Sequence, residues 1–305
     1  MKKFVFLFII FFACYKSGHT QQLPQFRHAA FSQFYYNPAY AMDPDKPDIL
    51  INHRSQWTGF EGSPTTSSLS GTYGFLDDMA AGLTVCNDFI GATKNLNLTL
   101  SYAYNLKINN EWDMNFGIAW SFMQTQIDGS KIDLYHDDDE LVMENISGKS
   151  WKPDANAGIM ISNNMYYGGF SAMQLFESKY RLFDDQEGSI SAQRHYFITG
   201  GGHFAAGRES KIHADILTQL SSGTPAHVNL TGLWEYNNSL IAGLSYSLAD
   251  AIGLNVGYQY KDFLILYSYD IITTRLMSTS GGSHEITLGY HLNLDHSSPT
   301  YQPMF

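Results

Sequence analysis

Apolar and polar side chains alternate without interruption from Leu96 to Ile108. Every even position in this stretch is apolar or aromatic, and every odd position is polar or small. Successive side chains of a β-strand point to opposite faces, so the pattern predicts a strand with one apolar and one polar face. At roughly 3.3 Å per residue the strand would be about 43 Å long. Soluble strands usually have about 3–10 residues, whereas a tilted membrane strand needs about 9–11, so this length favours a membrane β-barrel with a polar lumen.

The same period-two pattern recurs along the rest of the chain. It predicts an all-β fold, a transmembrane antiparallel β-barrel of about fourteen strands. About 20 residues are available for each strand with its connection, a spacing that suits bacterial barrels. The predicted strands are Ile49–Trp57, Thr65–Phe75, Met79–Asp88, Thr93–Ile108, Glu111–Gln126, Pro153–Ser162, Met165–Leu175, Arg194–Ala205, Ser210–Leu220, Ala226–Tyr236, Ser239–Leu248, Ala251–Tyr260, Asp262–Thr273 and Ser283–Leu292.

The lengths of the predicted connections also indicate a barrel. Counted from the first strand, the even-numbered connections are mostly tight, for example Asn109–Asn110 and Asn237–Asn238. Outer-membrane barrels have short periplasmic turns and long external loops, so we expect connections to be sorted in this way. The odd-numbered connections include all the long ones, which are Thr58–Pro64, Ile127–Lys152, Phe176–Gln193 and Thr274–Gly282.

The first twenty residues have the features of an export signal. Lys2 and Lys3 precede the apolar run Phe4–Ala13, and small residues precede Gln21. A basic start, an apolar run and a small-residue site are typical of a secretory signal peptide. Ten apolar residues are too few to cross a bilayer as a helix, which makes an uncleaved anchor the weaker alternative. Cys14 raises a further alternative, a lipoprotein signal.

We expect three regions after the signal peptide at 1–20. Residues 21–47 are polar and aromatic, contain turn residues and have no sustained periodicity, which predicts an ordered N-terminal leader, either periplasmic or a plug. Residues 48–294 are expected to form the outer-membrane barrel, and residues 295–305 a C-terminal tail. The leader's aromatic side chains either plug the lumen or pack under it. They are Phe31, Phe34, Tyr35, Tyr36 and Tyr40.

Charge and cysteine content exclude several classes of protein. The formal net charge is −11, and the signal carries three Lys and no acid, so −14 remains after its removal. A chain this acidic is a poor partner for nucleic acid or anionic lipid headgroups. Cys86 is the only cysteine beyond the signal, which excludes a disulfide framework and a cysteine-based metal site. Tyr, Phe and Trp make up 15% of the chain, which suits the aromatic girdles of a membrane barrel.

The candidate chemical motifs each have a structural interpretation that fits better. The run His136–Glu140 offers carboxylates to Ca²⁺ but lacks the glycine and spacing of a calcium loop, so a solvated acidic loop is expected. Gly200–Gly202 lies in a strand pattern with no following helix, which favours a bend or close packing over phosphate binding. His213 and Asp215 share one strand face, where polar lumen groups that satisfy one another are the alternative to catalysis. Without a nucleophile motif or a His pair at metal spacing, we predict no enzymatic activity, cofactor or metal.

Arg54 and Glu285 suggest a contact that forms when the barrel closes. Arg54 faces the lumen on the first strand, and Glu285 faces the lumen on the last. Closing the barrel makes these two strands neighbours, so an interior ion pair is geometrically allowed. The alternative is two independently hydrated side chains.

Several motifs resemble the PorP/SprF family of Bacteroidetes. The segment Phe31–Ala41 contains Asn-Pro-Ala-Tyr-Ala, and Arg54–Thr66 contains Arg-Ser-Gln-Trp-Thr-Gly-Phe. The resemblance extends in order over nearly the whole chain after the signal. The remaining matching segments are Pro24–Phe26, Asn87–Gly91, Arg194–Tyr196, Tyr267–Asp270 and Gly282–Tyr290.

The resemblance implies an outer-membrane protein of the type IX secretion system, linked to protein export, gliding motility or surface display of adhesins. Its implied partners are outer-membrane lipid, periplasmic ring or peptidoglycan-binding proteins, and the C-terminal domain of a secreted adhesin cargo. The motif residues are candidates for structural or interaction roles. These candidates are Asn37, Pro38, Tyr40, Arg54, Trp57, Gly59, Asp270, His284 and Glu285.

Two departures from the family pattern matter. The family usually follows Asn-Pro-Ala-Tyr-Ala with Gly, whereas this chain has Met42. The family often ends at the aromatic residue of its final strand, whereas this chain continues to Phe305. Either Leu292 or Phe305 could therefore carry the C-terminal insertion signal.

Two functions from different classes fit these observations. The first is a docking and anchoring component, in which the leader and the tight turns face periplasmic partners while loops 127–152 and 176–193 meet cargo. The second is a passive or substrate-selective diffusion channel, because a polar lumen serves both roles. Conductance in planar bilayers separates them. An outer-membrane enzyme would need a convergent Ser, His and acid cluster near one rim, and the sequence pattern indicates none.

Overall fold

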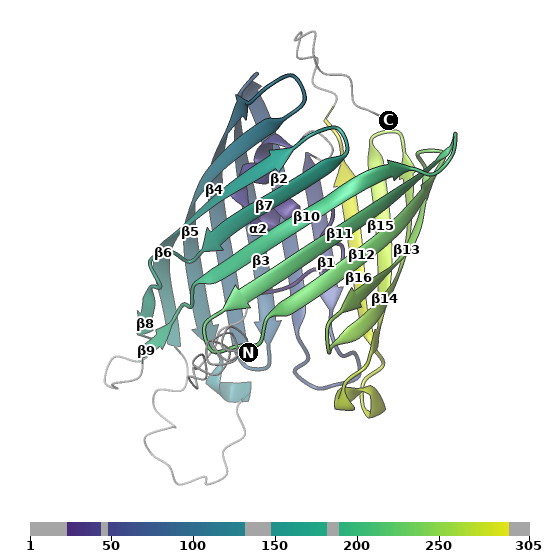
Figure 1. The fold of residues 1–305 in the computed structure, drawn as a ribbon. Helices are drawn as coiled ribbons and strands as arrows, with labels where there is room; N and C mark the ends of the chain where they lie inside the picture. The colour runs from purple at the N-terminus through teal and green to yellow at the C-terminus, as the bar shows by residue number, and fades with distance from the viewer. Residues whose placement is uncertain (1–22, 44–47, 132–147, 182–188, 293–305) are drawn as a thin grey trace, which may run out of the picture.

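The fold is a closed barrel of fourteen antiparallel strands (Figure 1). It was analysed as a computed structural model that describes residues 23–43, 48–131, 148–181 and 189–292. Each strand pairs with its neighbours in chain order, and the first pairs with the last. The barrel strands are β1 (Ile49–Ser55), β2 (Thr65–Leu76), β3 (Met79–Ile90), β4 (Thr93–Lys107), β5 (Asp113–Ile127), β6 (Gly148–Ser162), β7 (Tyr166–Met173), β10 (His195–Ala205), β11 (Ser210–Ser221), β12 (His227–Tyr236), β13 (Leu240–Ser247), β14 (Ala251–Tyr260), β15 (Phe263–Ile272) and β16 (Ser283–Tyr290).

The predicted alternation of faces is confirmed along the strands. On β4 the side chain of Leu100 is 52% exposed on the outer surface, whereas its neighbours Thr99 and Ser101 are buried in the barrel. Apolar side chains therefore cover the outside, where lipid contacts a membrane barrel, and hydroxyl and amide groups line the inside. Among the described residues no helix is long and apolar enough to cross a bilayer, a finding that concerns helices alone.

All fourteen predicted strands are present, with a few differences at their ends. Strand β1 stops at Ser55 rather than at Trp57, because Trp57 has a φ of +50° and leaves the extended conformation. Strand β6 begins at Gly148, earlier than the predicted Pro153, and its first residues pair with the end of β5. Lys149 and Lys152 interrupt the apolar pattern there, so only the backbone pairing reveals the strand.

The barrel has a short-turn end and a long-loop end. Turns such as Lys261–Asp262 join strands at the first, and connections such as 56–64 and 273–282 join them at the second, which lies at the bottom of Figure 1. The predicted loop 176–193 also contains a hairpin, β8 (Lys179–Arg181) paired with β9 (Ser189–Ser191). Its strands are too short for a periodicity signal. Short 3₁₀ turns, η2 (Gly129–Lys131) and η3 (Arg275–Ser278), lie in two other long connections.

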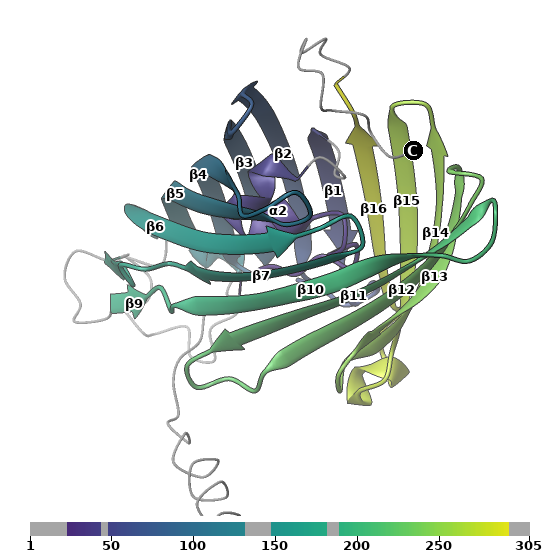
Figure 2. The same ribbon diagram turned by 45° about the horizontal axis from the view of Figure 1, so that its top comes forward.

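The leader, described over residues 23–43, lies inside the barrel. It contains the one-turn helix α2 (Gln33–Tyr36) and the 3₁₀ helix η1 (Pro38–Met42), and Figure 2 shows this purple segment enclosed by the strands. Of the two placements open from the sequence, the structure has the leader in the lumen. The side chains of the described leader residues are mostly buried by the barrel wall, and the expected contact of the leader with periplasmic partners stays a prediction.

Three sequence-based expectations lie outside the described residues. They concern the signal peptide at 1–20, the acidic run His136–Glu140 and the tail at 295–305. Of the two candidates for the insertion signal, Leu292 is described and its backbone N donates to Oδ2 of Asp48 at 2.7 Å. Phe305 lies outside the described part.

Candidate functional site

The leader folds compactly before it meets the barrel wall. Asn37 caps η1, with its Oδ1 accepting from the backbone N of Ala39 at 2.9 Å. Pro38 occupies the first position of η1, where its missing N–H costs no hydrogen bond. The hydroxyl of Tyr36 accepts from the backbone N of Phe26 at 2.7 Å and ties the two halves of the leader together.

Arg27 anchors the leader to the wall at β15. Its Nε lies 2.7 Å from Oδ1 of Asp270, and its Nη2 donates to Oδ2 of Asp270 at 2.8 Å. The Nη2 contact is a charge-assisted hydrogen bond, and the Nε contact adds a close ion pair. Both side chains are 2% exposed, so water screens the pair very little. A third contact runs from Nη1 of Arg27 to the hydroxyl of Ser247 at the end of β13.

The predicted ion pair between Arg54 and Glu285 is present. The two residues are direct partners across β1 and β16, and Nη1 of Arg54 lies 3.6 Å from Oε2 of Glu285. Arg54 also reaches Asp270, with Nη2 donating to Oδ2 at 3.0 Å. It therefore links the carboxylates of β15 and β16 and donates to the backbone O of Gln25 in the leader at 3.0 Å.

Glu285 accepts hydrogen bonds from the backbone of the leader. The amides of Arg27 and His28 donate to its Oε2 and Oε1 at 2.6 and 2.9 Å. The ring Nδ1 of His28 lies 3.2 Å from Oε1 and 2.8 Å from the hydroxyl of Thr287. We call Arg27, His28, Arg54, Asp270 and Glu285 the seam cluster, because it lies where β1 meets β16.

The seam cluster balances its charges. Two guanidinium groups face two carboxylates, with His28 as a further donor or acceptor. Burying an unpaired charge is costly, and removing one partner of a buried pair typically costs about 3–5 kcal/mol. The leader therefore completes a charge set that the wall alone, with one arginine and two acids, would leave unbalanced.

Aromatic packing holds the other side of the leader. Tyr36 lies against Phe197 of β10, with ring centroids 5.1 Å apart. Tyr40 forms an edge-on contact with Tyr167 of β7, and its hydroxyl lies 2.8 Å from that of Thr199. All of these aromatic side chains are buried. Burial of aromatic rings contributes a large apolar area, so this contact stabilises the leader in the lumen.

Two wall glycines lie directly against the leader. A Cβ on Gly117 of β5 would overlap the backbone of Pro38 and Ala39, and a Cβ on Gly158 of β6 would overlap the side chain of Asn37. Nδ2 of Asn37 donates to the backbone O of Ile159 at 3.0 Å. The wall is therefore shaped to the leader at the motif residues.

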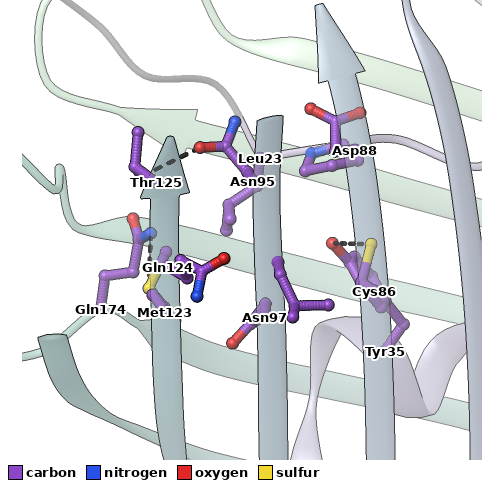
Figure 3. Close-up of a pocket in the computed structure, with 12 residues that line it drawn as sticks. Leu23, Tyr35, Cys86, Asp88, Asn95, Asn97, Met123, Gln124, Thr125 and Gln174 are labelled. Carbon is purple, nitrogen blue, oxygen red and sulfur yellow. Dashed lines mark hydrogen bonds between the residues drawn. The ribbon is translucent and has the colours of Figure 1, made fainter. Parts of the chain in front are cut away.

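A cavity of about 40 Å³ remains beside the leader (Figure 3). Leu23, Pro24 and Tyr35 of the leader line one side, and the ends of β3–β5 line the other. Figure 3 shows the hydroxyl of Tyr35 turned toward Cys86, at 3.7 Å from its Sγ. Wall residues at this cavity are mainly neutral and polar. They include Asn95, Asn97, Gln124, Thr125 and Gln174.

The structure brings some of the sequence candidates together and leaves others apart. Arg54, Asp270 and Glu285 meet in the seam cluster, and Asn37, Pro38 and Tyr40 lie together at η1. The other three candidates lie away from the lumen. Trp57 and Gly59 are in the β1–β2 loop with φ of +50° and +89°, and His284 contacts the hydroxyl of Tyr267 on the outer face at 2.7 Å.

Sequence reasoning missed Arg27 and His28. The available signal was a basic pair inside an acidic chain, next to Phe26. The contacts of these residues are with strands at the other end of the chain, and no local pattern reports such contacts.

The predicted pairing of lumen groups around His213 takes a different form. Nε2 of His213 lies 2.8 Å from Oε2 of Glu235, and its Nδ1 lies 2.6 Å from Nδ1 of His203. Asp215 accepts from the hydroxyl of Tyr167 instead. In the described part of the chain, no group of three or more His, Cys, Asp or Glu could hold a metal ion.

The close packing predicted at Gly200–Gly202 is present at its central residue. A Cβ on Gly201 would crowd the hydroxyl of Tyr167 and Oδ1 of Asp215.

A closed barrel with an apolar outer surface, a polar lumen and short turns at one end defines an outer-membrane β-barrel, here with its own leader inside. The chain belongs to the PorP/SprF family: the family described as type IX secretion system membrane protein PorP/SprF matches residues 18–290. The comparison with curated proteins found no match.

Three solved structures match most of the chain at low sequence identity. A FadL homologue of Pseudomonas aeruginosa has 12% identity and a TM-score of 0.47, with 88% of this chain and 94% of that chain covered. The NanC porin has 8% identity and a TM-score of 0.44, covering 80% and 100%. The toluene transporter TodX of Pseudomonas putida has 11% identity and a TM-score of 0.44, covering 89% and 94%.

Proposed function

We propose that the protein is a closed docking platform of the type IX secretion system, which anchors periplasmic secretion or gliding machinery at one end and cell-surface cargo at the other. The observation that carries this proposal is the leader. It occupies the lumen, its charged groups are neutralised by the wall, and the wall glycines fit around it. A barrel filled in this way gives binding surfaces rather than a path for diffusion.

The partners follow from the two ends of the barrel. The short turns, including Asn109–Asn110 and Arg208–Glu209, offer exposed polar side chains to periplasmic ring or peptidoglycan-binding proteins. The long-loop end includes the β8–β9 hairpin and the loops 56–64 and 273–282, which offer a surface to the C-terminal domain of an adhesin cargo. Catalysis forms no part of the proposed role.

Two loops at the long-loop end form a connected surface. Thr58 donates from its backbone N to the O of Gly282 at 2.8 Å and accepts at its O from the N of Gly281 at 2.7 Å. The exposed apolar side chains Phe60 and Met277 lie in these loops. We include these two exposed side chains in the proposed cargo-docking surface, where a partner would cover them.

A pull-down from native membranes tests this role. We expect type IX secretion components to co-purify with the wild-type protein and with Phe60→Ser and Met277→Ser. Arg208→Glu should reduce the periplasmic partners, whereas the two loop variants should reduce cargo at the cell surface. Heat-modifiable migration on gels controls for folding.

Planar-bilayer recording tests the alternative, a diffusion channel. We expect the wild-type barrel to give no large steady current. A large steady current together with no secretion partners in the pull-down would overturn the docking proposal.

A further inference from the structure

The two ends of the described leader lie at opposite ends of the barrel. Ala41 packs with Ala80 and Ala103, which lie at the short-turn ends of β3 and β4. At the other end of the leader, Nε2 of Gln25 donates to Oε1 of Gln219, two residues before β11 ends at Ser221 on the long-loop side.

Leader residues between these two ends contact strand residues at intermediate heights along the barrel axis. Tyr40 reaches Thr199 in the middle of β10. Arg27 reaches Asp270 near the end of β15 and Ser247 at the end of β13, both on the long-loop side. The leader therefore extends through the lumen from the short-turn end of the barrel, where β1 begins, to the long-loop end.

The cavity beside Leu23 gives an independent indication of this position. Its wall residues Asp88, Asn95 and Thr125 each lie within three residues of the long-loop end of their strands. In Figure 3 Leu23 is labelled beside Asn95 and Asp88. Pro24 and Gln25 next to it are partly exposed. This end of the leader thus lies at the mouth of the barrel.

We propose that residues 23–25 belong to the extracellular face of the protein, so that the chain passes through its own lumen from the periplasmic rim to the outside. Outer-membrane barrels place their long loops outside, and the described leader begins beside the strand ends that carry those loops. Its amino-terminal end is then a contact site for extracellular polypeptides and is inaccessible to periplasmic partners. The inference does not depend on the proposed docking role, because it is argued only from the contacts between the leader and the barrel strands.

Surface labelling of intact cells tests the topology. Gln25→Cys and the external control Ser278→Cys should react with a membrane-impermeant maleimide, while the periplasmic-turn control Asn110→Cys should react only after the outer membrane is permeabilised. Wild-type protein gives the baseline, since Cys86 is 3% exposed. Reaction of Gln25→Cys only after permeabilisation, together with Asn110→Cys, would overturn the inference.

If the thiol of Gln25→Cys is too enclosed to react, an epitope inserted between Gln22 and Leu23 tests the same topology. Antibody binding to intact cells supports the inference, and binding only to permeabilised cells overturns it. Heat-modifiable migration confirms that the tagged barrel is folded. The native pull-down reports separately on the docking role, so that the failure of one proposal is distinguishable from the failure of the other.

Discussion

Arg54 and Glu285 face each other across the strand pair that closes the barrel, with Nη1 of Arg54 3.6 Å from Oε2 of Glu285. This contact is one part of a larger arrangement. Glu285 also accepts two backbone amides of the leader, and Arg54 also binds Asp270. The closure of the wall and the seating of the leader therefore depend on the same carboxylates.

Glu285→Ala should lower the free energy of unfolding by about 3–5 kcal/mol, because it leaves two leader amides without their acceptor and removes one of the two carboxylates beside the buried Arg54. The urea midpoint of the detergent-solubilised barrel, followed by gel mobility, measures the change. Glu209→Ala in an exposed turn is the matched control and should change little.

The double variant Arg54→Glu with Glu285→Arg should rescue the single variants only in part. The exchange restores the pair across β1 and β16 but places a guanidinium against the amide donors of Arg27 and His28. Full recovery of the urea midpoint would show that the leader amides contribute nothing at this site.

Arg27→Ala should loosen the leader while the wall remains paired. Asp270 keeps Arg54 as a partner but loses its ion pair and hydrogen bond with Arg27, and we expect a conductive path to open as the leader moves. Single-barrel recordings in planar bilayers should show current steps that are absent from the wild-type protein. Arg208→Ala in the exposed β10–β11 turn is the control, and current steps of equal size there would contradict the assignment to the leader.

Gly117→Ala should displace η1 from the wall. The new methyl group overlaps the backbone of Ala39, which cannot rotate away as a side chain could, and overpacking of this kind costs about 1–3 kcal/mol. Gly232→Ala is the matched control, because a Cβ there meets nothing within 4 Å. Urea midpoints of the two variants should differ, and equal midpoints would show that the wall yields at Gly117.

Tyr40→Phe should lower the free energy of unfolding by about 0.5–1.5 kcal/mol, since it removes the hydrogen bond to Thr199 and leaves the ring in place. Tyr258→Phe on the outer surface, where the side chain is 46% exposed, is the control. A loss at Tyr258 as large as at Tyr40 would point to a general effect of the hydroxyl group.

Most of the barrel could be predicted because its information is local. The alternation around Leu100 and the sorted connections depend on neighbours in sequence and on the two faces of one strand. The pair Arg54–Glu285 could also be derived, since closure of any barrel makes its first and last strands neighbours.

The placement of the leader could not be derived in the same way. The residues next to Arg27 in the sequence do not show whether the leader lies in the lumen or below it. The partner of Arg27, Asp270, is 243 residues away in the chain. The fit of Gly117 to the backbone of Ala39 depends likewise on two surfaces that meet only in the folded protein. The strand end at Trp57 depends on a single positive φ that the residue type does not signal.

The position of Arg27 inside the lumen constrains the order in which the barrel assembles. The leader emerges early during synthesis, whereas Asp270 and Glu285 emerge near the end, so its acceptors do not exist until the last hairpin has been made. A barrel that sealed before the leader was inside would exclude the leader and leave two buried carboxylates opposite a single guanidinium. We therefore expect joining of the first strand to the last and immobilisation of the leader to occur as one cooperative event.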